Sequence, residues 1–320
     1  MIRILVTGAS TELGSELLRQ LSAEDHVIIG LIKRPSQTDS VSRLGGLPHV
    51  LDASDKYDLI KVMYDTEPDV ILNVLPQWSN TLLHDGLAWR NVHNSLPAQT
   101  AALLHAANDY QVSYLVHTSF AFLYGATHGR EGEKVNESTP INPPSNNRLL
   151  TAAAACEDLV SNNNQFPVSI LRLGYLYGPQ SRDLALYDQS FQLRRPYYAG
   201  SKNHLANFVH FNDAARAIAR VANKKPAKEI FNIVDGTPTS FGSFIDYYAQ
   251  CLGYKRPRRL AKLFARLAPI ITRQQLQQLD IRAAPVDNSK ARKLLGWIPE
   301  FTNYKIGLQQ TAQVQRGRTD

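Results

Sequence analysis

The chain has 320 residues, which suits one large α/β unit or two domains that share a core. Hydrophobic residues make up 43% and charged residues 20%, which excludes a disordered protein, and the net charge of +7 favours an anionic partner without identifying it. The two cysteines, Cys156 and Cys251, exclude a disulfide scaffold and a four-cysteine zinc site. No apolar run reaches the ~18 residues of a membrane span, and no secretory signal is visible. We therefore expect a cytoplasmic protein without a transmembrane segment or a metal site.

The first elements form a strand–helix–strand unit. Residues 2–6 are mostly apolar and β-branched, and they stop at a turn that begins with Thr7-Gly8. Residues 13–21 place four leucines on one helical face, and residues 26–32 are a second buried strand. Such a crossover joins parallel strands.

The alternation continues along the chain. We predict strands over 49–51, 69–74, 113–118, 168–173 and 230–234, and helices over 57–64, 97–108 and 152–160. This order indicates an α/β fold with a doubly wound parallel sheet of the Rossmann type, which binds ligands at the carboxyl ends of its strands. Residues 126–147 are predicted to be a long loop, and 180–206 show no clear period. We expect a dinucleotide-binding domain over 1–179, to which 207–235 return, and a smaller, mostly helical substrate lobe over 180–206 and 236–320.

The turn from Gly8 to Gly14 lies between a predicted strand and a predicted helix. There, backbone N–H groups and the helix N-terminus bind a pyrophosphate. Turns of this spacing have glycine where Thr11 stands, because glycine tolerates a positive φ and close approach of the ligand. With threonine, either the phosphates lie farther out and accept from the hydroxyl, or the site has decayed. The turn residues expected at the cofactor are Gly8, Ser10, Thr11, Glu12, Leu13 and Gly14.

The second predicted strand ends in Ile32-Lys33-Arg34. An acidic residue at this point binds the ribose 2′-hydroxyl of NAD. Here an apolar residue and two cations take its place, which favours the 2′-phosphate of NADP; a solvated basic turn is the alternative. Asp52, which ends the third strand, is a candidate for the adenine amino group or for a helix N-cap.

Further short motifs follow in order along the chain. They are Arg90-Asn91-Val92, His117-Thr118-Ser119, Leu123-Tyr124-Gly125, Leu171-Arg172, Tyr177-Gly178-Pro179, 207–210 with 213–215, 231–233, and 288–290 with 295–297. Together with the turn, they resemble the extended short-chain dehydrogenase/reductase family, the NAD-dependent epimerase/dehydratase group, over nearly the whole chain. The resemblance implies hydride transfer between NADP or NAD and a substrate carbon. It also implies further cofactor contacts at Ala53, Leu75, Asn91, Thr118, Leu173 and Tyr175.

The family's catalytic set is a tyrosine, a lysine four residues later on the same helical face, and a serine or threonine. The lysine lowers the pKa of the tyrosine, so that the phenol exchanges a proton with the substrate. The glutamate that follows this lysine by four residues matches Glu157, which puts the lysine position at Ala153 and the tyrosine position at Leu149. Counting back from Tyr124 puts the hydroxyl position at Phe120. Shifting the helix frame by one residue does not restore the pair.

Three apolar residues therefore stand where the resemblance implies proton-transfer groups. Because a general acid–base group contributes about 10²–10⁴-fold to a rate, the usual hydride chemistry should be slow. Tyr124, His117 and Tyr175 are candidate replacements near strand ends, with Tyr177 close by, although each residue type more often serves packing. Cys156 shares a helical face with Leu149 but lies about 10 Å from it, too far to replace the tyrosine.

Two basic segments bear on partners. Arg194 and Arg195, with Tyr197, are candidates for binding a substrate diphosphate. Residues 255–266 are cationic and amphipathic, and they could cover an anionic substrate, lie on a membrane surface, or form a solvated face. We favour the solvated face. No motif supports nucleic acid, so the expected partner is a small molecule, with a homodimer left open.

The sequence supports three functions. The first is an atypical oxidoreductase or epimerase-type enzyme that acts on a small or nucleotide-linked substrate with a non-standard proton donor. The second is a non-catalytic NAD(P)-binding sensor or regulatory subunit, which the apolar catalytic positions favour. The third is a non-redox isomerase, cyclase or lyase on the same scaffold, which the same apolar positions also favour.

Overall fold

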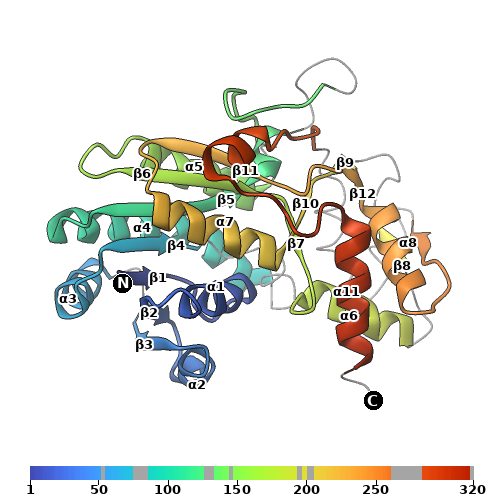
Figure 1. Ribbon diagram of the computed structural model, residues 1–320, viewed down its shortest axis with the longest axis horizontal. Coiled ribbons are helices and arrows are strands. Elements are labelled where there is room, and N and C mark those ends of the chain that lie inside the picture. Colours follow the sequence, from blue (N-terminus) through green and yellow to red (C-terminus); the bar gives the residue numbers. More distant parts are fainter. Residues whose placement is uncertain are drawn as a thin grey trace.

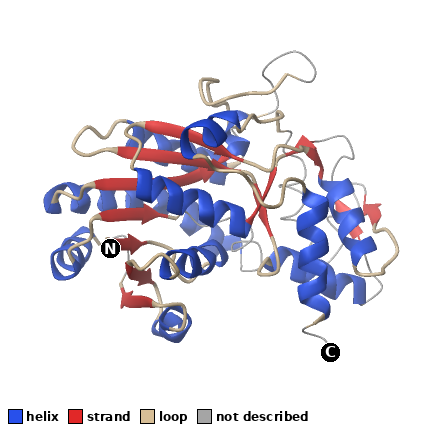
Figure 2. Ribbon diagram, in the orientation of Figure 1, coloured by secondary structure: helices blue, strands red, loops and turns tan. Residues whose placement is uncertain are grey.

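The computed structural model describes residues 1–51, 55–74, 86–125, 133–143, 147–192, 197–199, 205–260 and 283–317. Within these ranges, the side chains of 86–94, 197–199 and 259–260 are not described. The predicted elements of the central sheet are present, and they lie at the left of Figures 1 and 2.

Seven strands form one parallel sheet. Their order is β11 (Glu229–Ile233), β6 (Val168–Leu173), β5 (Tyr114–Phe120), β4 (Val70–Asn73), β1 (Arg3–Val6), β2 (Val27–Ile32) and β3 (Gly46–Val50). The strand order reverses between β1 and β4, where a doubly wound sheet opens a crevice for ligands. The predicted fold class is confirmed.

Helices cover both faces of this sheet (Figure 1). On one face, α1 (Glu12–Ser22) and α7 (Phe211–Lys224) pack on Ile4 and Val6. On the other, α3 (Lys56–Thr66), α4 (Gly86–Tyr110) and α5 (Arg148–Ser161) pack on Leu5 and its neighbours. Successive side chains of a strand point to opposite faces, which explains why Leu5 belongs to a different cluster from Ile4 and Val6. The short helix α2 (Thr38–Ser42) follows a 3₁₀ turn, η1 (Pro35–Gln37).

A second group of helices stands apart from the sheet, at the right of Figure 1. It contains α6 (Arg182–Gln192), α8 (Phe241–Cys251) and α11 (Tyr304–Arg316). These helices pack through one hydrophobic cluster, which includes Phe191 of α6, Phe244 of α8 and Leu308 of α11. Short paired strands border it: β7 (Tyr175–Tyr177) with β10 (Phe208–His210), β9 (Leu205–Ala206) with β12 (Thr239–Ser240), and β8 (Tyr197–Ala199) with β13 (Arg258–Leu260).

The structure differs from the expected elements at three places. Strand β3 begins at Gly46 and includes Pro48, which is allowed because β3 is an edge strand. Helix α4 begins at Gly86 rather than Pro97 and carries Pro97 inside it. Residues 182–192, where the sequence shows no clear period, form α6. The buried face of this helix includes Asp183 and Ser190, which interrupt the apolar pattern. The division into two lobes remains a prediction.

Candidate functional site

The turn after β1 is shaped by two glycines. Gly8 has φ +64°, and a Cβ atom there would lie 2.9 Å from the carbonyl oxygen of Val74. A Cβ on Gly14 would overlap the carbonyl oxygen of Gly8. The start of α1 therefore lies directly against the turn, and the first N–H groups of the helix, which have no partner within it, are presented at the carboxyl edge of the sheet. This arrangement fits a pyrophosphate of a dinucleotide.

Thr11 adopts a conformation that a β-branched residue tolerates. Its φ is −78° and its ψ is 167°, so no positive φ is required. Its hydroxyl donates to the carbonyl oxygen of Gly8 over 2.8 Å and accepts from the amide of Gly14 over 3.0 Å. The hydroxyl proton goes to the carbonyl of Gly8 while the hydroxyl oxygen caps the helix, and a contact of this hydroxyl with a phosphate stays a prediction.

A buried polar chain runs from the ends of β1 and β4 to the middle of β5. The hydroxyl of Thr7 donates to Oδ1 of Asn73, and Nδ2 of Asn73 donates to Nδ1 of His117 over 3.0 Å. Nε2 of His117 then carries the proton of the neutral ring. Burial lowers the pKa of His117 to about 3, so near neutral pH this side chain has no cationic proton to give.

The end of β2 keeps its two cations in solvent. Ile32 is buried, whereas Lys33 and Arg34 are exposed. The side-chain oxygen of Gln37 accepts from both of their amides, over 3.2 Å and 3.0 Å, and so holds the chain in a tight turn.

Helix α5 is locked onto β6 by a buried ion pair. The Glu157 carboxylate accepts from Nε and Nη2 of Arg172 at 2.7–3.1 Å, and both side chains are buried. Because residues four apart share a helical face, this contact directs Ala153 and Leu149 to the same side of α5 as Glu157.

The three positions that correspond to the family's catalytic set are all buried. Phe120, Leu149 and Ala153 belong to one apolar cluster, together with Tyr175 and Tyr177. Ser119, next to Phe120, is also buried, but neighbouring residues of a strand point to opposite faces. The described side chains of this cluster thus supply no acid at the expected points.

The candidate tyrosines are engaged elsewhere. Tyr124 donates to Oδ1 of Asn232 over 2.8 Å, and the guanidinium of Arg172 stacks on its ring. Tyr175 donates to Oδ2 of Asp183 over 2.5 Å, and burial raises its pKa well above 10. Burial also raises the pKa of Tyr177, whose ring packs against Phe244 of α8. All three are therefore poor proton donors in this conformation.

Cys156 is likewise unsuited to nucleophilic chemistry. Its thiol accepts from the hydroxyl of Thr100 over 3.3 Å, and burial raises its pKa to about 11. A thiol of this kind stays protonated near neutral pH.

Several expected site residues lie outside the described residues or are described only as backbone. Asp52, Ala53 and Leu75, like Arg194 and Arg195, lie outside, as do 261–266 of the basic segment. The backbones of Asn91 in α4 and Tyr197 in β8 are described, but their side chains are not. Thr118 and Leu173, the remaining expected contacts, are buried at the ends of β5 and β6.

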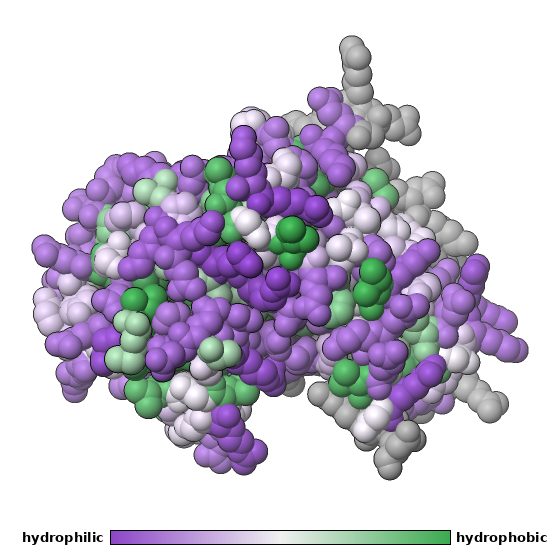
Figure 3. Space-filling view, in the orientation of Figure 1, coloured by the Kyte–Doolittle hydropathy of each residue, from purple (hydrophilic) through white to green (hydrophobic). Residues whose placement is uncertain are grey.

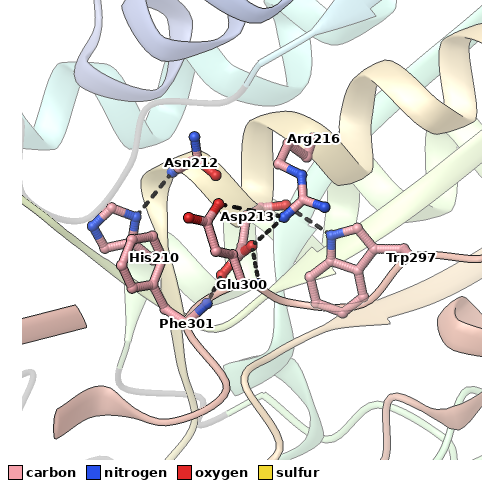
Figure 4. Close-up of polar contacts among 7 residues, drawn as sticks. All are labelled: His210, Asn212, Asp213, Arg216, Trp297, Glu300 and Phe301. Carbon is pink, nitrogen blue, oxygen red and sulfur yellow. Dashed lines mark hydrogen bonds and ion pairs between the residues drawn. The ribbon is translucent and has the colours of Figure 1, made fainter. Parts of the chain in front are cut away.

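Asp213, within the motif that follows β10, has a structural role (Figure 4). Its fully buried carboxylate accepts from the amides of Glu300 and Phe301, over 2.7 Å and 2.9 Å, and from Arg216 over 3.0 Å. Its carbonyl accepts from the indole N–H of Trp297 over 2.9 Å. These contacts fasten residues 297–301 to α7 and so position the chain that enters α11.

Two charged residues near the turn were not expected from the sequence. Nε of Arg182, at the start of α6, lies 3.2 Å from Oε1 of Glu12. Asp183, beside it, is fully buried, and burial raises its pKa to about 6. Both residues follow the turn by about half the length of the chain, so the sequence near the turn does not show that they lie close to it.

The face of the molecule in Figure 3 is mostly hydrophilic. Hydrophobic residues appear there in small separate groups. Over the described residues, no helix has the length and apolar character needed to cross a membrane.

Comparisons with known proteins identify the family and agree with the fold. The model of the NAD-dependent epimerase/dehydratase family matches residues 4–234. A 3-diazoavenalumate denitrifying reductase from a Streptomyces species is 27% identical over 316 residues, which cover 96% of this chain and 99% of that protein. UDP-glucose 4-epimerase from Mycolicibacterium smegmatis is 23% identical, over 99% of this chain and 100% of that protein. The crystal structure of a Thermus thermophilus UDP-glucose 4-epimerase in complex with NAD shares the fold, with a TM-score of 0.78 at 20% identity over 99% of both chains.

Proposed function

The chain belongs to the NAD-dependent epimerase/dehydratase family, and from that premise we propose that it is a nicotinamide-dependent reductase. The hydride acceptor is one that needs no proton from a tyrosine of the chain. The observation that carries this proposal is the contrast between a preserved glycine turn, Gly8 to Gly14, and the buried Leu149 and Ala153 at the family's catalytic positions.

The chain's own groups define the cofactor end. The turn around Gly8 and the N-terminus of α1 hold the diphosphate, and buried Ala9 and Gly14 keep the helix close to the strand. A nicotinamide bound along this edge supplies a hydride. The polar chain from Thr7 to His117 ties the ends of β1 and β4 to the middle of β5.

NADP is the proposed form of the cofactor. Exposed Lys33 and Arg34 follow buried Ile32, so the site offers cations and no carboxylate where a 2′-phosphate would lie.

Calorimetric titration with NADPH and NADH tests the cofactor. We expect NADPH to bind more tightly than NADH. Arg34→Gln should weaken NADPH binding by about tenfold, as loss of one charge-assisted contact implies, and should change the affinity for NADH by no more than about twofold. Arg43→Gln removes another exposed arginine, which directly follows α2, and should leave both affinities unchanged. An unchanged NADPH-to-NADH ratio in Arg34→Gln contradicts the NADP assignment.

The substrate end excludes proton transfer at the expected points. Reduction of a ketone leaves an alkoxide that requires a proton, which Phe120, Leu149 and Ala153 cannot give. The 27% identical relative is named as a denitrifying reductase of a diazo compound. When hydride replaces the diazonium group of an arene, a C–H bond forms, the C–N bond breaks and dinitrogen leaves, so no oxygen anion needs a proton. We propose electron-poor acceptors of this kind as the substrate class.

A panel of acceptors tests this chemistry. With NADPH, the wild type should reduce aryl diazonium ions well above the uncatalysed rate and reduce ketones poorly. Leu149→Tyr with Ala153→Lys should raise ketone reduction by about 10²-fold or more, as a restored acid–base pair would. Leu149→Phe with Ala153→Met fills the same space without a donor and serves as the control. If the wild type already reduces ketones and the Tyr/Lys variant does not improve on it, the proposal is wrong.

The second candidate is a cofactor-binding sensor without catalysis. It is favoured by the buried hydrogen bonds that hold Tyr124 to Asn232 and Tyr175 to Asp183. Tight NADPH binding without turnover of any acceptor in the panel would support this candidate over the reductase.

A further inference from the structure

The start of α11 lies against the short strands β7 and β10 and against the segment that follows β11. Tyr177 of β7 is fully buried, and a Cβ atom on Gly307 of α11 would overlap its hydroxyl group. The ring of His210 in β10 packs edge-on against that of Tyr177, with 5.3 Å between the ring centroids. Glycine at position 307 therefore lets α11 lie directly on these strands, with polar side chains enclosed beneath it.

Asp235 is the acidic group enclosed at this junction. It lies two residues past β11 and is only 2% exposed. Its amide donates to the carbonyl oxygen of Phe208 in β10 over 2.7 Å, and its Oδ1 accepts from the amide of Thr237 over 2.8 Å. Oδ2 is buried without a hydrogen-bond partner among the described residues. A carboxylate has about four acceptor sites, so this group is poorly satisfied when it is ionised.

The titratable groups that face Asp235 do not favour its ionised form. The carboxylate of Asp213, on α7, raises the pKa of Asp235. Burial lowers the pKa of His210 to about 4, so near neutral pH the imidazole offers no positive charge. Burial raises the pKa of Tyr177, and the two carboxylates add to that rise, so the phenol keeps its proton. Asp235 thus faces a like charge and two neutral rings.

The cations near this junction contact other groups. They lie on α7, beside Gly236 and at the start of α11. Their contacts are Arg216 with Asp213, Arg292 with Asn288, and Lys305 with the ring of Tyr247. In the part of the chain that the structure describes, no ion pair includes Asp235. An ionised Asp235 is therefore a buried charge without a paired cation, which is costly.

Protonation of Asp235 is consequently linked to the position of α11. Burial raises the pKa of Asp235 to about 7, above the ~3.9 of an exposed aspartate, although the amide of Tyr304 at the start of α11 favours the ionised form. A group whose pKa is raised in the packed state stabilises that state as long as it holds the extra proton. This contribution is complete below about pH 4 and is lost as the pH rises through about 7.

We propose that Asp235 is a proton-linked latch that holds α11 on β7 and β10. With its proton, the carboxyl group stays buried beneath α11. Without it, the carboxylate favours an open state in which α11 moves away and water solvates Asp235. Because α11 packs against α8, the latch also controls how the group of helices α6, α8 and α11 rests against the sheet. The latch requires neither the cofactor nor a substrate, so it stands apart from the proposed function.

Hydrogen–deuterium exchange of the whole protein tests the latch. The protection factor of the α11 amides, which corrects for the intrinsic pH dependence of exchange, reports how often this helix opens. Between pH 6 and pH 8.5 it should fall by about tenfold, as a pKa of about 7 in the closed state and ~3.9 in the open state implies. The amides of α3, which packs on the central sheet, should change by less than about twofold.

Asp235→Asn keeps the size of the side chain but cannot ionise, so protection of α11 should change by less than about twofold over the same pH range. Asp188→Asn is the matched control. Asp188 is half-buried on α6, burial raises its pKa, and Tyr248 of α8 donates to it over 3.2 Å. This variant should keep the tenfold fall. Thermal unfolding shows whether each variant is folded, and Asp235→Ser is a second neutral variant.

Three outcomes overturn the inference. Protection of α11 that stays constant between pH 6 and pH 8.5 in the wild type shows that the position of this helix is not linked to a proton. A fall that persists in Asp235→Asn, or in Asp235→Ser if the first variant does not fold, assigns the linkage to another group. Loss of the fall in Asp188→Asn as well shows that the effect is not specific to Asp235.

Discussion

Two regions at the carboxyl edge of one sheet have different properties. The turn from Gly8 to Gly14 is built from backbone, and its shape depends on the absence of a Cβ at two positions. The end of β5 and the start of α5 depend on side chains, and Phe120, Leu149 and Ala153 there are apolar and buried. A site built from backbone keeps its shape as long as the glycines that it requires are present. A side-chain site changes its chemistry without loss of the fold when the replacements pack well.

The scaffold of the second region rests on contacts away from the catalytic positions. Arg172 and Glu157 hold α5 to β6, and Tyr124 stacks on Arg172 and reaches Asn232 of β11. These contacts explain how α5 keeps its place when the residues at the catalytic positions change. The predictions below separate these structural roles from those of the turn.

The largest effect is expected from Arg172→Met. It leaves Glu157 as a buried carboxylate without its cation, which costs about 3–5 kcal/mol of the free energy of unfolding. Urea denaturation measures this loss. Arg19→Gln, which removes an exposed pair, should cost under about 1 kcal/mol. Similar losses in the two variants would show that the buried pair does not hold α5.

The next effect concerns acid stability. Burial lowers the pKa of His117 to about 3 in the folded protein, below the ~6.5 of an unfolded chain. The folded state therefore binds fewer protons between these values, so this contribution to stability is complete above pH 6.5 and is lost as the pH falls towards 3. Between pH 7 and pH 4 it amounts to about 3 kcal/mol.

Comparison with His117→Asn isolates that contribution, because Asn retains an acceptor for Asn73. The difference in unfolding free energy between wild type and variant should shrink as the pH falls from 7 to 4. Asp183 and Asp235, whose pKa values burial raises to about 6 and about 7, contribute in the opposite direction in both proteins. A pH-independent difference for His117→Asn contradicts its buried neutral role.

Gly14→Ala should give the smallest loss of stability but a selective loss of function. The added methyl group overlaps the carbonyl oxygen of Gly8, so we expect about 1–3 kcal/mol of destabilisation and NADPH binding weaker by about tenfold or more. Gly317→Ala, where a Cβ meets nothing closer than 3.7 Å, is the control. Calorimetry and urea denaturation measure the two effects. Wild-type affinity in Gly14→Ala would separate the turn from the cofactor.

The sheet was predictable because its strands are continuous apolar runs between turns. Strand β6 matches the expected residues 168–173, and the unit from β1 to β2 is confirmed. Short strands such as β7 and β10 were missed, since three residues give no period and their pairing is between segments far apart in the chain. Helix α6 was missed because Asp183 and Ser190 lie on its buried face.

The site was predictable only in part. Gly8 and Gly14 follow from local spacing, and so does the apolar character of Leu149 and Ala153. The hydrogen bonds that hold Tyr124 and His117 connect residues 108 and 44 positions apart, and the sequence carries no local sign of them.

By itself, the sequence determined the class of fold, the glycine turn and the residue types at the positions where the family resemblance implies catalysis. These are local properties, set by side-chain identity and by apolar period. The tertiary structure decided what the remaining polar groups do. It held the candidate tyrosines in buried hydrogen bonds and brought Arg182 to Glu12. A hydrogen bond or ion pair depends on which distant element lies opposite, and packing alone settles that.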